Sequence, residues 1–177
     1  MTDKLTHQER LKRLLHQEKP GSPLPKEAEA EEVEVPHGAF GYLRGVPDHP
    51  GAVEFRLGDG TSAFFPYALL GPWRFDPGEG LLLLKFSGDL TYVVLIRGSN
   101  LDKPLNEGAI NLTTGGLQRQ RVLWVREMSE EEIRQVGETA PTIDSIQVQQ
   151  FESQAALKEW LKAKAPAFLP ASERADA

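Results

Sequence analysis

Cysteine is absent from the 177 residues of this chain. Its absence excludes disulfide bonds, thiolate nucleophiles and metal sites built on cysteine. A chain without cysteine fits a reducing compartment, where disulfides do not persist. We therefore expect a protein of a bacterial-type cytoplasm.

Long apolar runs are also missing. Runs such as Leu81–Leu84 and Val93–Ile96 are far shorter than the roughly 20 residues that a membrane helix needs. The first residues are polar and lack the apolar stretch of a secretory signal. We expect no membrane partner.

Signatures of catalysis are missing as well. The chain has no nucleophile elbow, no Ser-x-x-Lys, no phosphate-loop Gly-Lys and no His-Glu-x-x-His. This favours a non-catalytic protein, for which we expect no cofactor and no metal. The alternative is a hydrolase-like enzyme with a dispersed site, for which Asp48, His49 and Arg97 are the candidates.

Positive charge is scarce where a nucleic-acid surface would need it. The net charge is −6, and residues 37–127 contain nine Lys or Arg against nine Asp or Glu. A surface that binds phosphates concentrates positive charge. The distribution disfavours RNA as a partner and favours another protein or self-association.

The chain divides into segments of different composition. Residues 1–19 predict a short helix, because Thr6 and Glu9 form a capping box ahead of a leucine stripe. Residues 20–36 are rich in proline and glutamate and predict a linker. Beyond the central core, residues 128–165 predict a helix-strand-helix extension, and residues 166–177 predict a frayed tail.

The core, residues 37–127, alternates short β-rich runs with glycine-, proline- and aspartate-rich turns. We expect a mainly β fold: a small antiparallel meander that forms a barrel or curled sheet, SH3-like or Sm-like in style. Helices at 129–136 and 153–164 should pack outside it, and residues 143–151 should form an edge strand. The expected interior residues are Tyr42, Leu82, Leu84, Val93, Leu95 and Trp124.

Candidate binding residues follow the apolar strand that ends near residue 97. Arg97 and Asn100 place polar donors beside an irregular excursion, residues 101–120, although Asn100 can also bond backbone across a turn. The aromatic segment that contains Tyr67 and Trp73 is either a plug for the end of the barrel or a ligand groove.

Asp48 and His49 lie between two prolines in the sequence Pro-Asp-His-Pro. A neighbouring carboxylate and imidazole are compatible with acid–base or metal chemistry. A rigid turn explains the same residues, because prolines fix the backbone on both sides.

The string Ile96-Arg97-Gly98-Ser99-Asn100 resembles the second signature of the Sm-like RNA-binding barrels. The segment Gly41 to Leu57 is loosely similar to the first signature of that family, but Gly51 stands nearest the place of its base-reading asparagine. The resemblance implies an Sm-like RNA-binding barrel that uses Arg97, Asn100 and the pair Arg119 and Arg121.

Two functions from the binding class therefore stand beside the hydrolase-like enzyme. We expect a non-catalytic protein-binding or scaffolding module that acts through residues 1–36 or the 143–151 edge. The alternative is the Sm-like RNA binder.

Overall fold

The computed structural model of the chain describes residues 31–33, 38–44, 51–106, 109–170 and 172. The predicted helix at 1–19, together with Asp48 and His49, lies outside the described residues. In the part described, no helix is long and apolar enough to cross a membrane.

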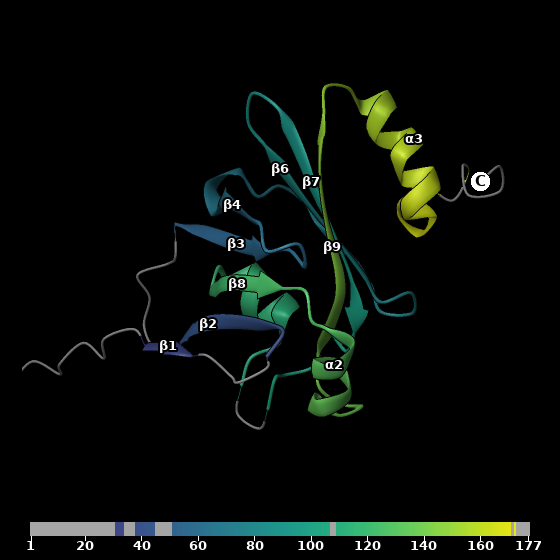
Figure 1. The fold of residues 1–177 in the computed structure, drawn as a ribbon. Coiled ribbons are helices and arrows are strands. Elements are labelled where there is room, and N and C mark those ends of the chain that lie inside the picture. Colours follow the sequence, from purple (N-terminus) through teal and green to yellow (C-terminus); the bar gives the residue numbers. More distant parts are fainter. Residues whose placement is uncertain (1–30, 34–37, 45–50, 107–108, 171, 173–177) are drawn as a thin grey trace, which may run out of the picture.

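The fold is mainly β, as predicted, and consists of two sheets and flanking helices (Figure 1). Sheet A has the order β1-β2-β8-β3-β4, and sheet B has the order β5-β6-β7-β9. The strands of sheet A are β1 Glu31–Val33, β2 Phe40–Arg44, β3 Ala52–Arg56, β4 Ser62–Pro66 and β8 Val122–Arg126. Those of sheet B are β5 Arg74–Asp76, β6 Leu81–Ser87, β7 Thr91–Ser99 and β9 Thr142–Phe151.

Helical segments connect and cover the sheets. They are the 3₁₀ helices η1 Tyr67–Leu69, η3 Leu117–Arg119 and η4 Pro166–Phe168, the π-helix η2 Leu112–Gly116, and the α-helices α2 Glu130–Val136 and α3 Gln154–Lys164. Both α-helices match the predicted positions. Strand β1 falls within residues 20–36, where the composition predicts a linker, and it pairs with β2.

Turns that contain glycine connect β3 to β4, β5 to β6 and β6 to β7. Strands β3 and β4 are joined at the predicted turn Gly58-Asp59-Gly60, where Gly60 has a positive φ of 84°. The meander β5-β6-β7 is also confirmed, and β9 completes sheet B beside β7.

The meander prediction is wrong for sheet A. Strand β8 lies between β2 and β3 and is parallel to β3. The excursion after β7 carries the chain back to sheet A. There β8 pairs with β3, about seventy residues earlier, and with β2, more than eighty residues earlier, and local periodicity contains no sign of these contacts. Within the described residues the two sheets do not close into a barrel.

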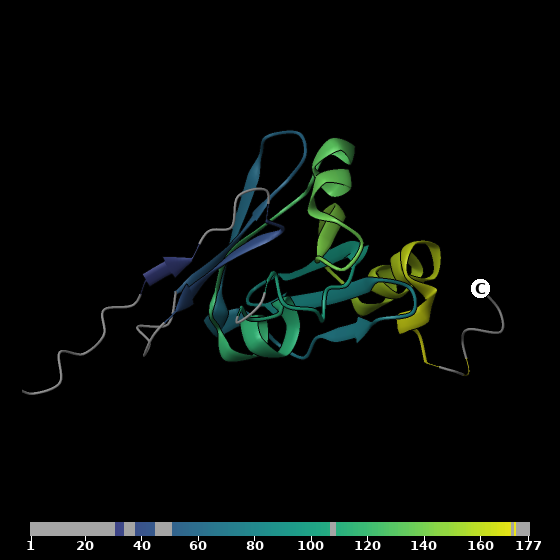
Figure 2. The same ribbon diagram turned by 90° about the horizontal axis from the view of Figure 1, so that it is seen from below.

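The main core fills the space between the inner faces of the sheets. Sheet A contributes Phe40, Tyr42 and Phe55, while sheet B contributes Leu82, Leu84 and Ile96, all at most 2 % exposed. On the other face of sheet B, Val93 and Leu95 pack under α3 and η4. The molecule therefore has three layers, with sheet A, sheet B and α3 in that order (Figure 2).

The six residues expected in the interior are all buried. They do not share one interior, however. Val93 and Leu95 face α3. Trp124 is not part of the main core, because it lies on the outer face of sheet A over Gly41.

Candidate functional site

Arg97 holds the end of α3. Its guanidinium donates a hydrogen bond to the carbonyl oxygen of Lys164, the last residue of the helix. The final carbonyls of a helix have no partner within it, and positive charge is favourable there. A second arginine acts nearby, since Arg74 donates to the carbonyl oxygen of Phe168 at 2.7 Å. The structure therefore gives Arg97 a partner inside the protein.

Asn100 bonds backbone across a turn, as the sequence predicts. Its side-chain nitrogen donates to the carbonyl oxygens of Glu138 at 2.8 Å and of Ala140 at 3.1 Å. Its φ of 55° is in the left-handed region that asparagine tolerates. Asn100 and Arg97 thus bond to different segments, and the structure does not direct their side chains to one site.

Tyr67 and Trp73 belong to the packing between the sheets. The hydroxyl of Tyr67 donates to the carbonyl oxygen of Val122 at 2.8 Å, and burial raises the pKa of this phenol. Trp73 packs half-buried against the same core. In the same core, Phe65 of β4 stacks on Phe86 of β6 with ring centroids 4.6 Å apart. In this arrangement the aromatic segment fills space within the protein.

Shallow hollows follow the excursion and the loop after α2. One of about 440 Å³ is lined by Ser99, Arg134 and Thr142, and one of about 530 Å³ by Lys103, Asn106 and Thr139. Asn100, Glu138 and Ala140 line both. A third, of about 540 Å³, is lined by polar side chains that include Asn111, Thr114, Gln118 and Arg119.

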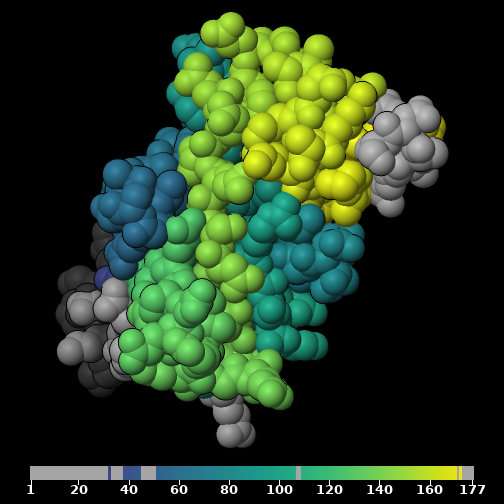
Figure 3. All heavy atoms as spheres, turned by 45° about the vertical axis from the view of Figure 1, so that its right-hand side comes forward, coloured from purple at the N-terminus to yellow at the C-terminus, as the bar shows by residue number. Residues whose placement is uncertain are grey.

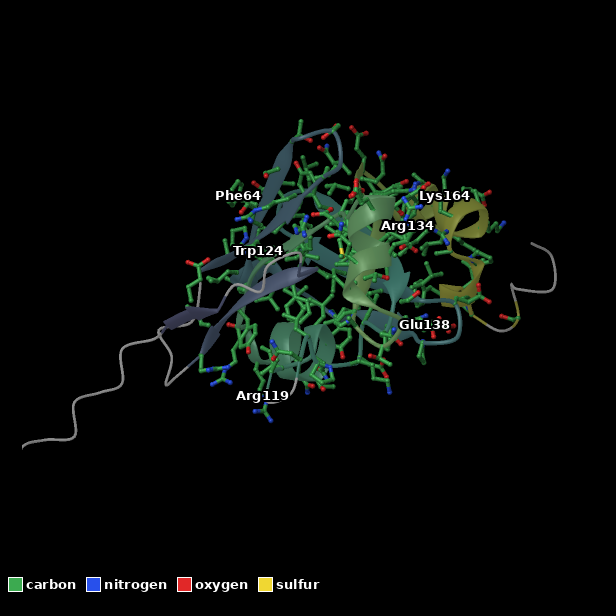
Figure 4. The ribbon with its side chains drawn as sticks, turned by 60° about the horizontal axis from the view of Figure 1, so that its bottom comes forward. Phe64, Arg119, Trp124, Arg134, Glu138 and Lys164 are labelled. Carbon is green, nitrogen blue, oxygen red and sulfur yellow. The ribbon has the colours of Figure 1, made fainter. Side chains whose placement is uncertain are left out.

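None of the three hollows is lined by Arg97, Asn100 and Arg119 together. Arg119 follows η2, whereas the partner of Arg97, Lys164, ends α3 on the other side of sheet B (Figures 2 and 4). In the described residues no group of three His, Asp or Glu side chains is placed to hold a metal ion.

The predicted edge strand, β9, is partly covered. The amide of Met128 donates to the carbonyl oxygen of Ile143 at 2.9 Å. The carboxylate of Glu127 then accepts hydrogen bonds from the amides of Ile146 and Gly58, which ties β9 to the β3–β4 hairpin. Figure 3 shows this hairpin, in blue, beside β9. Among the described residues, the uncovered part of this edge is the last few residues of β9.

Strand β4 presents the more open edge. The residues that flank β4 bond to those that flank β3: the Leu57 amide donates to the carbonyl oxygen of Thr61 at 2.8 Å, and the Tyr67 amide donates to that of Gly51 at 3.0 Å. Because bonding direction alternates along an antiparallel strand, the backbone groups of Ser62 and Phe64 point away from β3. No hydrogen bond occupies these outward groups within the described residues.

Phe64 stands at the middle of this edge with 66 % of its surface exposed. The neighbouring Phe65 is buried in the core, because successive side chains of a strand point to opposite faces. Two other large apolar side chains are exposed, Leu69 of η1, which follows β4 in the chain, and Leu90 of the β6–β7 hairpin, 39 % and 40 % exposed. Leu69 lies against Gly88 of that same hairpin. We call Ser62–Pro66 with these three apolar side chains the β4 edge surface.

Paired side chains occupy the outer face of sheet A beside Phe64. Glu54 pairs with both Phe64 and Trp124 across the sheet, so the three side chains share this face. Arg56 forms an ion pair with Glu54 at 2.8 Å and lies 4.5 Å from the centre of the Trp124 ring. Figure 4 shows Phe64 and Trp124 on the side of the molecule away from Lys164.

Sequence reasoning missed Phe64 because it grouped the aromatic residues as one cluster. The alternation in Ser-Ala-Phe-Phe-Pro contained the signal, since two adjacent phenylalanines in a strand cannot both face one core. The exposed member could not be identified without knowing that β4 is an edge strand with nothing over its outer face.

No family model, no curated protein and no solved structure matches this chain. The geometry of the described residues is therefore what supports a functional proposal.

Proposed function

We propose that this protein is a non-catalytic protein-binding module that accepts an extended segment of a partner as an additional strand beside β4. One observation carries the proposal: Phe64 is 66 % exposed on an edge strand whose outward backbone groups are unpaired in the described residues. Strand addition of this kind obtains affinity from main-chain hydrogen bonds and specificity from side chains.

The composition of the edge supports this use. Soluble proteins usually block edge strands with charged side chains, bulges or prolines. Ser62 to Phe65 carry no charge, and Pro66 stands only at the end of the strand. An added strand would therefore find donors and acceptors at Ser62 and Phe64, with the Phe64 ring beside it as an anchor.

The RNA-binding alternative has less support from the described geometry. The guanidinium of Arg97 bonds to Lys164, away from Arg119. The chain also has a net charge of −6, which repels phosphate. We also propose that the protein acts in the cytoplasm and that its partner is a protein. The Sm-like barrel is then only an analogy for the style of the fold.

A random peptide library displayed on phage tests the function. Selected peptides should bind the whole protein, and two edge variants should weaken that binding at least about tenfold, as truncation of an anchor residue does. Phe64→Thr removes the apolar ring and keeps a good strand former. Ser62→Pro removes one outward N–H and keeps the ring.

The matched control is Gln150→Pro, which makes the same change at an exposed outward position of β9. Thermal unfolding shows which variants are folded. Peptides that bind Phe64→Thr and Ser62→Pro as tightly as the original protein would overturn the proposal, as would peptides that lose affinity only for Gln150→Pro.

A further inference from the structure

Exposed carboxylates stand at both ends of the β4 edge surface. Asp59 lies at the tip of the β3–β4 hairpin, just beyond Ser62, and Asp89 lies beside Leu90 in the β6–β7 hairpin. Both residues are exposed. No ion pair involves either of them within the described part of the chain.

Asp59 is held in place by its own turn. Its carboxylate accepts hydrogen bonds from the amide of Thr61 at 2.9 Å and from the hydroxyl of the same residue at 2.6 Å. These bonds lower the pKa of Asp59, so the carboxylate is charged at neutral pH. Its position beside the edge is therefore fixed by the hairpin.

Arg56, which lies opposite Ser62 on β3, is already paired. The guanidinium of Arg56 bonds to Glu54 at 2.8 Å and covers Trp124. The other oxygen of Glu54 accepts from the Ser62 hydroxyl at 2.8 Å. The surface thus has an apolar middle, formed by Phe64, Leu69 and Leu90, and negative ends.

Resting on the proposed function, we infer that the partner of the β4 edge is an extended peptide with an apolar centre and lysine or arginine residues flanking it. A residue opposite Phe64 would pack on the ring. If the peptide runs antiparallel to β4, its residue two positions after the one opposite Phe64 would lie opposite Ser62. The peptide residues that follow would approach Asp59, because a strand rises about 3.3 Å per residue. Opposite charges at the ends increase the association rate and select the partner.

Synthetic peptides with one valine- and threonine-rich centre test the inference. One peptide has lysine at both ends, its twin has glutamate, and a third has the lysines and a central proline. Fluorescence anisotropy with the whole protein measures each Kd. We expect the lysine peptide to bind about tenfold more tightly than the glutamate peptide, and the proline peptide not to bind.

Variants assign the charge preference to its residues. Asp59→Asn keeps an acceptor for the Thr61 amide, and combined with Asp89→Asn it should reduce the preference for lysine to about threefold or less. The control Asp144→Asn removes an exposed carboxylate from β9 and should leave the preference unchanged. Raising the salt concentration to about 0.5 M should have the effect of the double variant.

The possible failures are distinguishable. If neither charged peptide binds, the proposed function itself fails. If the glutamate peptide binds as tightly as the lysine peptide, strand addition stands and the inference about the partner is overturned. Sedimentation of the protein alone gives a third outcome: a dimer that Phe64→Thr dissociates would assign the edge to a second copy and also overturn the inference.

Discussion

At the scale of single residues, Gly98 fixes the join between β7 and β9. The pairing register shifts between Arg97 and Gly98. A Cβ at this position would lie 2.0 Å from the carbonyl oxygen of Thr142. This oxygen belongs to the backbone of β9, so it cannot move away as a flexible side chain could. The residue is therefore needed for close approach.

Gly98→Ala should lower the free energy of unfolding by about 1–3 kcal/mol, the usual effect of overpacking. Urea unfolding measures the change. Gly51→Ala is the matched control, because a Cβ there meets nothing within 4 Å, and we expect a change within about 0.5 kcal/mol. Equal stability of the two variants would contradict the claim that Gly98 is required for the close approach of β7 and β9.

Glu127 is the second residue on which the arrangement of the sheets depends. Its carboxylate accepts hydrogen bonds from Gly58 and Ile146, one on each sheet. In Glu127→Gln the side-chain NH₂ must face one of the two amides, so that amide loses its acceptor. We expect a loss of about 1–3 kcal/mol in the free energy of unfolding.

Chemical unfolding and amide exchange at Ile146 measure this effect. Glu152→Gln makes the same change at an exposed position and should be close to neutral. A Glu127→Gln variant with unchanged stability and a still-protected Ile146 amide would show that the carboxylate does not connect the sheets.

At the scale of elements, the capping box of α2 makes stability depend on pH. The Ser129 amide donates to Glu132 at 2.9 Å, and Arg126 pairs with it at 2.8 Å. These contacts, the Ser129 amide first, lower the pKa of Glu132 from 4.5 to about 2. The stabilisation is therefore fully present above pH 4.5 and is lost as the pH falls towards 2.

Glu132→Gln should be less stable than the original protein at pH 7, and the difference should shrink between pH 4.5 and about pH 2. Thermal unfolding over that range measures it. Glu131→Gln, one residue earlier on the exposed surface of α2, should show a smaller difference at every pH. A difference for Glu132→Gln that stays constant down to pH 2 would contradict the assigned cause.

Helix α3 offers a test of the role that the structure gives Arg97. Arg97→Ala should free the last turn of α3, so that the Ala165 amide, bonded to Leu161 at 2.9 Å, exchanges faster. Amides of β6 should exchange as before, because its pairing with β7 is unchanged. Unaltered exchange at Ala165 would return Arg97 to the set of residues available for a ligand.

Neighbouring residues predicted the helices and hairpins well, whereas the order of the strands depends on contacts between distant residues. Ser129 and Glu132 predicted α2, and Gly58-Asp59-Gly60 predicted the β3–β4 hairpin, because helix caps and turns depend on residues that are close together in the sequence. The insertion of β8 between β2 and β3 depends on contacts far apart in the sequence. For the same reason the sequence did not predict that β4 is an edge strand, since only the strand order shows which strand lacks a neighbour.

At the scale of the whole molecule, the layers determine which surfaces remain for a partner. Helix α3 covers the outer face of sheet B, and Glu127 and Met128, which connect β8 to α2, cover the first half of the β9 edge. Sheet A has no helix over its outer face in the described residues (Figure 2). It ends at β4, where Phe64 is exposed. The proposed binding surface is thus the part of the fold that the other layers leave open.

The most direct measurement is amide hydrogen exchange of the whole protein, followed by NMR with and without a bound peptide. The account predicts that the Ser62 and Phe64 amides, which point outward from β4, become protected at least about tenfold when the peptide binds. The amides of Ala63 and Phe65, already bonded to β3, should change much less. A bound peptide that leaves Ser62 and Phe64 unprotected, or that protects β9 or the loop hollows instead, would contradict the central claim.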